Sequence, residues 1–181
     1  MKERKSTRVA LGGMASALCL LLMFMTGLIP FGTFALPAMA GIVLIVVVVE
    51  MGRSTAALVY AAVSLLSLFM CPDKEAAMMF IGFFGFYPVI KELLDRIRPK
   101  ILQGLCKFAV FNAAILASYW VIINLFGLDD IMEEMGAFGD LTLFVTWLMG
   151  CGVFIMFDIA LGRIHWAYKH VLRYRFFRKT R

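Results

Sequence analysis

The sequence predicts an all-α membrane protein, a compact bundle of six transmembrane helices with both termini in the cytoplasm. Three observations lead to this fold class. Of the 181 residues, 62% are hydrophobic and only 17% are charged, which is more apolar than a soluble domain of this length. Several apolar runs approach the roughly 20 residues that cross a hydrocarbon core. Short connectors separate the runs, as is typical of antiparallel neighbours in one bundle.

Six apolar segments define the expected spans within one integral membrane domain, residues 1–181. They cover residues 9–29, 36–49, 55–70, 76–90, 101–126 and 141–168, and a basic tail follows over residues 169–181. The second, third and fourth are short for full spans, so we expect them to be kinked or displaced toward one interface. The first follows a basic start, MKERKSTR, but is longer than the apolar core of a signal peptide, so we expect it to be retained.

Turn residues mark the connectors in order. PFGT at residues 30–33 turns the first hairpin, and MGRS at residues 51–54 turns the second, where Ser54 is placed to cap the third helix. CPDKE at residues 71–75 turns the third, with Asp73 or Glu75 at the start of the fourth helix, where negative charge is favoured. Pro88 is expected to bend or end that helix. KELLDRIRPK at residues 91–100 predicts an amphipathic turn at the interface, and residues 127–140 form an acidic fifth connector.

The basic residues predict the orientation of the bundle. When the connectors are assigned alternately to two sides, only Lys74 of the 18 Lys and Arg residues lies on the side away from the termini. Positively charged residues stay in the cytoplasm. Both termini are therefore expected inside, and the acidic connectors outside.

Few ionisable residues lie within the expected spans, where burial in lipid is costly. Glu50 ends the second segment and Arg53 follows at i+3, a spacing that favours an ion pair at the helix end or a contact point for a cytoplasmic partner. Asp158 lies deeper, in the sixth segment. It can pair with Arg163 on its own helix or with Lys107 on the fifth, as a structural link or as a coupling or ion site.

The sequence carries no signature of an enzyme or of a metal site. The four cysteines are too far apart for a CxxC motif, and neither His165 nor His170 joins them in a ligand pattern. HExxH, P-loop and GxGxxG motifs are absent. We therefore expect no catalytic residues, metal or cofactor, and any active transport would take its energy from a partner.

Small residues at four-residue spacing mark three of the expected helices. Such spacing lets helices approach closely, so we expect packing within the bundle to explain most of them. Docking of another membrane protein is the alternative for the first helix. The residues are Ala10, Gly13 and Ala17 on the first helix, Ala57 and Ala61 on the third, and Ala113 and Ala117 on the fifth.

Polar and aromatic residues gather toward the outer ends of the fifth and sixth segments. A side-chain amide in lipid needs a partner, so we expect an outward-facing pocket between helices four to six; an aromatic belt is the alternative. A pocket without an apolar plug would favour transport, and one filled by Phe83, Phe84 or Tyr119 would favour a scaffold. The expected lining residues are Asn112, Tyr119, Trp120, Asn124, Thr142, Thr146, Trp147, Met79 and Phe83.

Three stretches carry a family resemblance: RVALGGMASALCLLL, IPFGTFALPAMAGIVLIVVVVEMG and CPDKEAAMMFIGFFGFYPVIKELL. With six spans and both termini inside, the chain resembles the S component, the substrate-binding membrane subunit, of energy-coupling factor (ECF) transporters. The resemblance covers nearly the whole chain and concerns its size, its topology and the residue types along it. It implies a protein of the bacterial cytoplasmic membrane that captures a small molecule, of the vitamin or precursor class, from outside.

The resemblance also implies partners, namely a membrane coupling subunit and two cytoplasmic ATPases. Ala10, Gly13 and Ala17 occupy the face of the first helix that contacts the coupling subunit in that family, with Gly-x-x-x-Ala in place of the usual Ala-x-x-x-Ala. The alternative function is a non-transport membrane scaffold of the MreD-like cell-shape type. In that case the outer polar residues are structural and the small-residue faces are partner sites.

Overall fold

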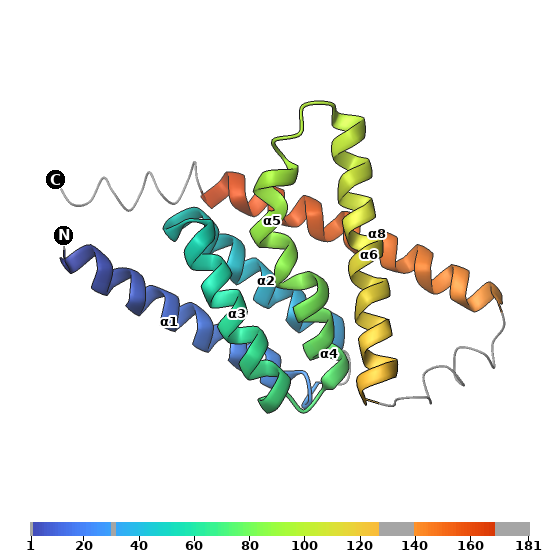
Figure 1. Cartoon of the computed structure of the whole chain (residues 1–181), viewed down its shortest axis with the longest axis horizontal. Coiled ribbons are helices and arrows are strands. Elements are labelled where there is room, and N and C mark those ends of the chain that lie inside the picture. The colour runs from blue at the N-terminus through green and yellow to red at the C-terminus, as the bar shows by residue number, and fades with distance from the viewer. Residues whose placement is uncertain (1, 30–31, 127–139, 169–181) are drawn as a thin grey trace.

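The computed structural model describes residues 2–29, 32–126 and 140–168, without the side chains of residues 2–5, 119, 122–126, 140–143 and 146. It confirms the all-α fold, and six helical stretches in this part are long and apolar enough to cross a membrane. In order they are α1 (Lys2–Met25), α2 (Gly32–Met51), α3 (Arg53–Met70), a fourth span built from α4 (Lys74–Met79), the π-helix η1 (Phe80–Phe84) and α5 (Phe86–Leu94), then α6 (Lys100–Phe126) and α8 (Asp140–Ala167) (Figure 1).

The second, third and fourth spans are longer than their apolar runs. α2 has 20 residues, α3 has 18 and the fourth span has 21, about the length that a hydrocarbon core requires. The added residues lie at both ends of α2 and of the fourth span, and at the start of α3, which begins at Arg53. α5 continues through Lys91 to Leu94, so the prediction of a separate interfacial turn beginning at Lys91 was wrong.

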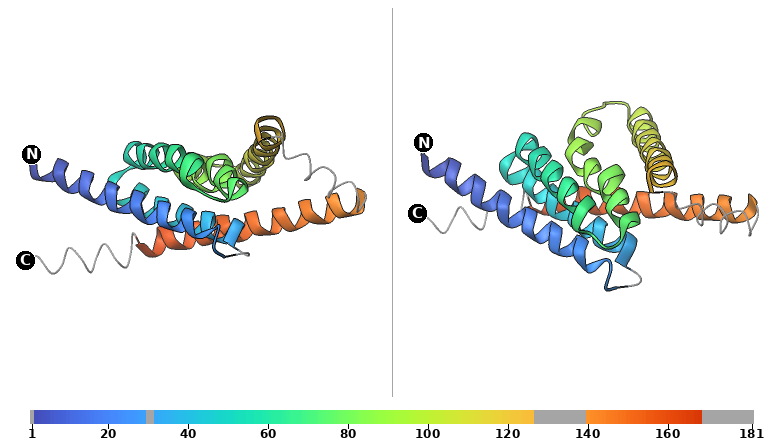
Figure 2. Two further views of the ribbon diagram at one scale, coloured as in Figure 1. Left: turned by 90° about the horizontal axis from the view of Figure 1, so that it is seen from below. Right: turned by 60° about the horizontal axis from the view of Figure 1, so that its bottom comes forward.

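α1, α2 and α3 pack against one another as one group. The fourth span lies between this group and α6 and contacts both (Figures 1 and 2). α8 packs against α2 and crosses behind α5 and α6 in Figure 1. The start of α1 and the end of α8 lie at the left of Figure 1, with the α2–α3 turn near them.

Two turns are set by different residues. Asp73, one of the two acidic residues expected at the start of the fourth helix, caps α4: its Oδ1 accepts a hydrogen bond from the N–H of Ala76 at 3.0 Å, and its Oδ2 accepts one from the hydroxyl of Thr33 at 2.9 Å. Ser54 does not cap α3, because the helix already begins at Arg53 and Gly52 is the N-cap residue. Gly52 has a φ of 87°, which glycine adopts without steric cost.

The fourth span contains a π-helical turn before Pro88. The N–H of Gly85 donates to the carbonyl of Phe80 at 2.7 Å, five residues back in place of four. Pro88 has no N–H and its ring crowds the carbonyl four residues earlier, that of Phe84. A π-turn accommodates this irregularity within a continuous span. Pro88 therefore lies inside α5 and does not end the helix.

Two glycines let neighbouring helices approach the π-turn. A Cβ atom on Gly41 of α2 would overlap the carbonyl oxygen of Phe84, and one on Gly82 would overlap the hydroxyl of Ser118 on α6. The fourth span thus approaches α2 and α6 closely at these two glycines. A larger residue at either position would push the neighbouring helices apart. This close packing places the candidate site residues described next.

Candidate functional site

Aromatic side chains fill the interior between the fourth span, α6 and α8. Phe83 is 3% exposed, and its ring centroid lies 5.2 Å from those of Phe111 and Tyr87 and 5.8 Å from that of Phe154. Phe111 and Phe154 stack on each other at 4.7 Å. Met79 is buried in the same core. Phe83 and Met79 therefore lie in packed interior and not beside open space, which is the filled arrangement that we associated with a scaffold.

The described outer residues lie at the helix surface. The Nε1 of Trp147 on α8 donates to Oδ1 of Asn112 on α6 at 2.9 Å, and Nδ2 of Asn112 donates to the carbonyl of Phe108 at 2.9 Å. This pair links the two helices and satisfies the amide. Trp120 is 66% exposed. The side chains of four other expected pocket residues, Tyr119, Asn124, Thr142 and Thr146, lie outside the described part.

A largely buried ionic network joins α5, α6 and α8. Asp158 on α8 is the central residue. Its Oδ2 lies 3.0 Å from Nζ of Lys107 on α6, and its Oδ1 accepts a hydrogen bond from the ammonium group of Lys91 on α5. The hydroxyl of Tyr87 also donates to Oδ1, at 2.7 Å. Lys91, only 4% exposed, donates in addition to the carbonyl of Asp158 at 3.1 Å. One carboxylate therefore holds groups from two other helices.

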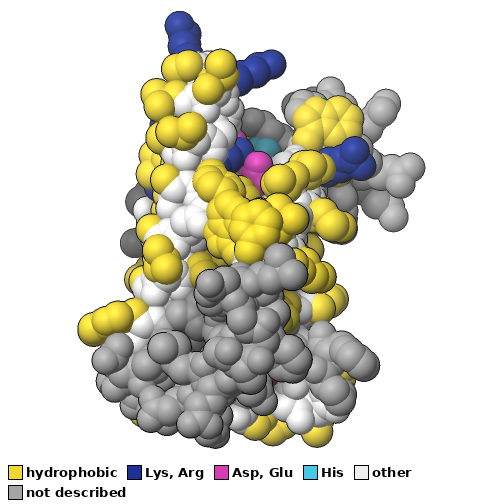
Figure 3. Space-filling model, turned by 90° about the vertical axis from the view of Figure 1, so that its right-hand side faces the viewer, with side chains coloured by type: hydrophobic (Ala, Val, Ile, Leu, Met, Phe, Trp, Pro, Cys, Tyr) yellow, Lys and Arg dark blue, Asp and Glu magenta, His cyan; other side chains and the backbone are white. Residues whose placement is uncertain are grey.

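Asp95 completes the network at its more exposed edge. Its Oδ1 lies 2.6 Å from Nζ of Lys107, and its Oδ2 lies 3.8 Å from Nζ of Lys91. The two lysines and the two aspartates balance in charge, which offsets the cost of placing ions in a low-dielectric interior. Figure 3 views the molecule from the right-hand side of Figure 1. It shows basic, acidic and histidine side chains together in a hollow, beside apolar side chains.

The network confirms one predicted pairing and adds two residues that the sequence analysis missed. Asp158 pairs with Lys107, as one of the two alternatives predicted, while Arg163 is exposed and takes no part in the ion pairs of the described residues. Lys91 and Tyr87 were missed because Lys91 was assigned to a connector. Their i, i+4 spacing places them on one helix face, and this signal would have found them once α5 was extended.

The predicted ion pair between Glu50 and Arg53 is not formed between these two described side chains. Nε of Arg53 donates to the carbonyl of Val89 on α5 at 3.2 Å. Glu50 interacts instead with Tyr168, which follows α8. Burial, together with the side-chain interaction and the charge of Glu50, raises the pKa of Tyr168 to about 12. Arg53 thus connects the start of α3 to α5, and Glu50 connects the end of α2 to the residue that follows α8.

No protein-family model, curated protein or solved structure matches this chain. Both oxygens of Asp158 are occupied by donors, and a cation could enter only by displacing a lysine. No group of His, Cys, Asp and Glu in the described ranges could hold a metal ion. This geometry favours the structural link over the ion site for Asp158.

The small-residue face of α1 is open. Ala10, Gly13 and Ala17 are all exposed, and a Cβ atom on Gly13 would meet no atom within 4 Å. α1 packs on α3 through an adjacent face, where a Cβ on Gly12 would lie 3.7 Å from Val59. The small residues at positions 61, 113 and 117 are exposed as well, so the prediction that packing within the bundle explains most of these residues was wrong.

Proposed function

We propose that this chain is a membrane subunit that docks a partner membrane protein through α1, in the manner of the S component of an ECF importer. The supporting observation is the open face formed by Ala10, Gly13 and Ala17. Small residues at this spacing allow a partner helix to approach the backbone closely. Within the described part of the chain, no helix covers Gly13. The face is therefore suited to a coupling subunit.

In this proposal the protein lies in the bacterial cytoplasmic membrane with both termini inside. It captures a small molecule of the vitamin or precursor class from outside and passes it to an importer driven by cytoplasmic ATPases. The ionic network of Lys91, Lys107 and Asp158 holds three helices together. Such a link lets the bundle move as one body when the partner changes conformation.

Reconstitution tests the importer directly. The chain is purified with a coupling subunit and the two ATPases, placed in lipid vesicles, and supplied with a panel of labelled vitamins and precursors. We expect ATP-dependent accumulation of one panel member, and none when ATP or the chain is omitted. If the complex assembles and hydrolyses ATP but accumulates no panel member, the importer proposal fails.

A scaffold of the MreD-like cell-shape type is the second candidate, and the filled interior around Phe83 favours it. A scaffold needs no internal space for a small molecule, whereas a substrate-binding subunit does. The two functions therefore differ in ligand response. An importer subunit should unfold at a higher temperature with its vitamin present. A scaffold should show no shift with any panel member and should co-purify with cell-wall synthesis proteins.

A further inference from the structure

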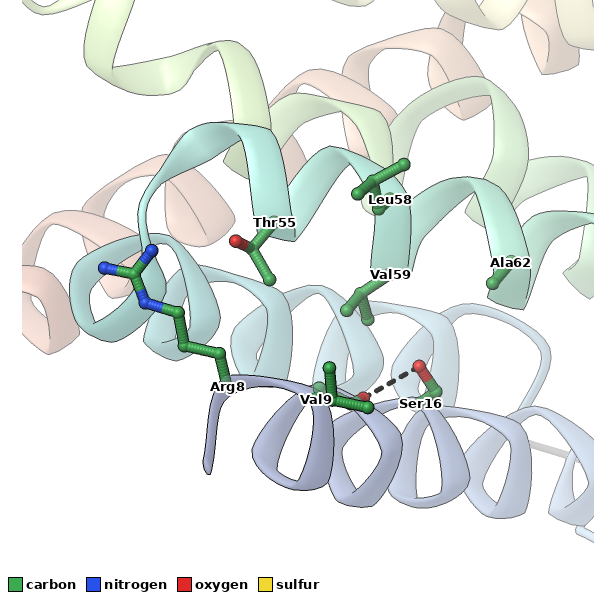
Figure 4. A pocket seen from close by; sticks show the side chains of 8 residues that line it. Arg8, Val9, Ser16, Thr55, Leu58, Val59 and Ala62 are labelled. Carbon is green, nitrogen blue, oxygen red and sulfur yellow. Dashed lines mark hydrogen bonds between the residues drawn. The ribbon is translucent and has the colours of Figure 1, made fainter. Parts of the chain in front are cut away.

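A groove runs between α1 and α3, beside the proposed docking face. Figure 4 shows it with Arg8 at one end and Ala62 toward the other. Its space of about 430 Å³ is shallow and mostly open to the surroundings. A Cβ atom on Gly12 would lie 3.7 Å from Val59, so α1 and α3 are close there, and the strongly exposed Val9 and Leu58 line the groove.

The wall of the groove is apolar in effect, although two hydroxyl groups line it. The hydroxyl of Ser16 donates to the carbonyl of Gly12 at 2.9 Å, and that of Thr55 donates to the carbonyl of Met51 at 3.3 Å. Each hydroxyl is therefore bonded to a backbone carbonyl four residues back, that of Ser16 within α1 and that of Thr55 at the last residue of α2. The occupant of the groove needs no polar group along this wall, and its apolar part is in contact with Val9, Leu58 and Val59.

Arg8 gives the groove one charged end. Its side chain extends from α1 toward the start of α3 in Figure 4. Among the described side chains no carboxylate forms an ion pair with it, and it is exposed. The sequence before it adds Lys2, Arg4 and Lys5 against the single acid Glu3. The occupant should therefore combine an apolar length with a negative charge at one end.

We propose that this groove binds an anionic phospholipid. One acyl chain lies along Val9, Leu58 and Val59, and the headgroup phosphate contacts the guanidinium of Arg8. Arginine pairs well with phosphate because its planar fork matches two phosphate oxygens. Basic pockets between transmembrane helices are a known setting for anionic headgroups. This site is independent of the proposed importer function, because it uses the α3-facing side of α1 and not the Gly13 face.

Native mass spectrometry of the full chain tests the proposal. Protein in neutral detergent is mixed with phosphatidylglycerol or phosphatidylcholine of the same acyl chains, and retained lipid is counted. We expect selective retention of phosphatidylglycerol. Arg8→Gln should weaken it about fivefold, because one basic residue near an anionic headgroup contributes about 1 kcal/mol. Ala62→Phe should also weaken it by occupying the groove.

Two variants serve as matched controls. Arg98→Gln removes another exposed arginine, and Ala61→Phe adds the same ring to an exposed neighbouring position that does not line the groove. Both should retain phosphatidylglycerol as the wild type does. Equal retention of the two lipids, or equal behaviour of each variant and its control, would overturn the proposal. A dimer whose formation is blocked by Ala62→Phe would also overturn it, because a second copy would then occupy the groove.

Discussion

Nζ of Lys107 on α6 and Oδ2 of Asp158 on α8 lie 3.0 Å apart, within two of the membrane-spanning helices. The same carboxylate accepts Lys91 and Tyr87 from α5. Asp158 is therefore the common point of three helices. Its removal should affect the bundle far more than the removal of a surface charge.

The first prediction concerns Asp158→Asn. This variant leaves the ammonium groups of Lys91 and Lys107 with only the more exposed Asp95 as a shared counter-charge. Breaking a buried pair in this way costs about 3–5 kcal/mol of unfolding free energy. Equilibrium unfolding of the detergent-solubilised protein, followed by circular dichroism, measures the loss. Adding Lys91→Met to Asp158→Asn should recover part of it, because one unpaired charge is then removed.

Asp95→Asn is the matched control for this prediction. Asp95 contacts the same two lysines, but 42% of its side chain is exposed. Exposed pairs contribute at most about 1 kcal/mol. The network would not be a structural link if the two asparagine variants lost the same stability.

The sequence was sufficient to predict the helices and one ion pair, but not the interior. Apolar runs set the number of spans, because length and hydropathy decide whether a helix can cross a bilayer. Lys107 was found because an acid within a span needs a partner at similar depth. Phe83 was misplaced because rings that line a pocket and rings that fill it have the same periodicity. The π-turn near Phe84 was missed because it depends on how backbone and neighbours adjust together.

The second prediction is a pH effect at the end of α8. The pKa of Tyr168 is raised from 10.0 to about 12, by burial first and then by the side-chain interaction and charge of Glu50. The folded protein thus favours the neutral phenol. Its contribution to stability is complete below pH 10 and is lost as the pH rises through about 12. Ultraviolet titration of phenolate absorbance should show this late transition.

Two variants assign the transition to the Tyr168–Glu50 contact. Tyr168→Phe should remove one phenolate equivalent near pH 12. Glu50→Gln should move that equivalent to lower pH, because the carboxylate charge disfavours the phenolate. An unchanged titration curve in Glu50→Gln would contradict the contact.

The third prediction tests the docking face of α1. Under the proposed function, Gly13→Leu or Ala17→Leu should reduce co-purification of the proposed coupling subunit, because the branched side chain holds the partner helix away from the backbone. Both positions are exposed, so the isolated chain should unfold at the wild-type stability or above it. Ala117→Leu on α6 changes an equally exposed small residue on another helix and should co-purify normally. Normal co-purification of the two α1 variants would show that the face is not used.

The fourth prediction concerns the contact between α2 and the π-turn. Gly41→Ala would place a Cβ atom against the carbonyl oxygen of Phe84, and 3.0 Å from Cζ of Phe157. A flexible side chain could move aside, but the carbonyl belongs to the backbone of η1 and cannot rotate away without shifting the helix. Overpacking of this kind costs about 1–3 kcal/mol. Unfolding monitored by circular dichroism should show that loss.

Gly104→Ala on α6 separates this contact from helix propensity. Alanine favours a helix over glycine by about 1 kcal/mol at either position, and a Cβ on Gly104 meets no atom within 4 Å. The control should therefore be as stable as the wild type or more so. A loss confined to Gly41→Ala then comes from the approach of α2 to Phe84. If both variants gain stability, α2 does not depend on that approach, and the close packing that positions the fourth span would have to be held by the side chains alone.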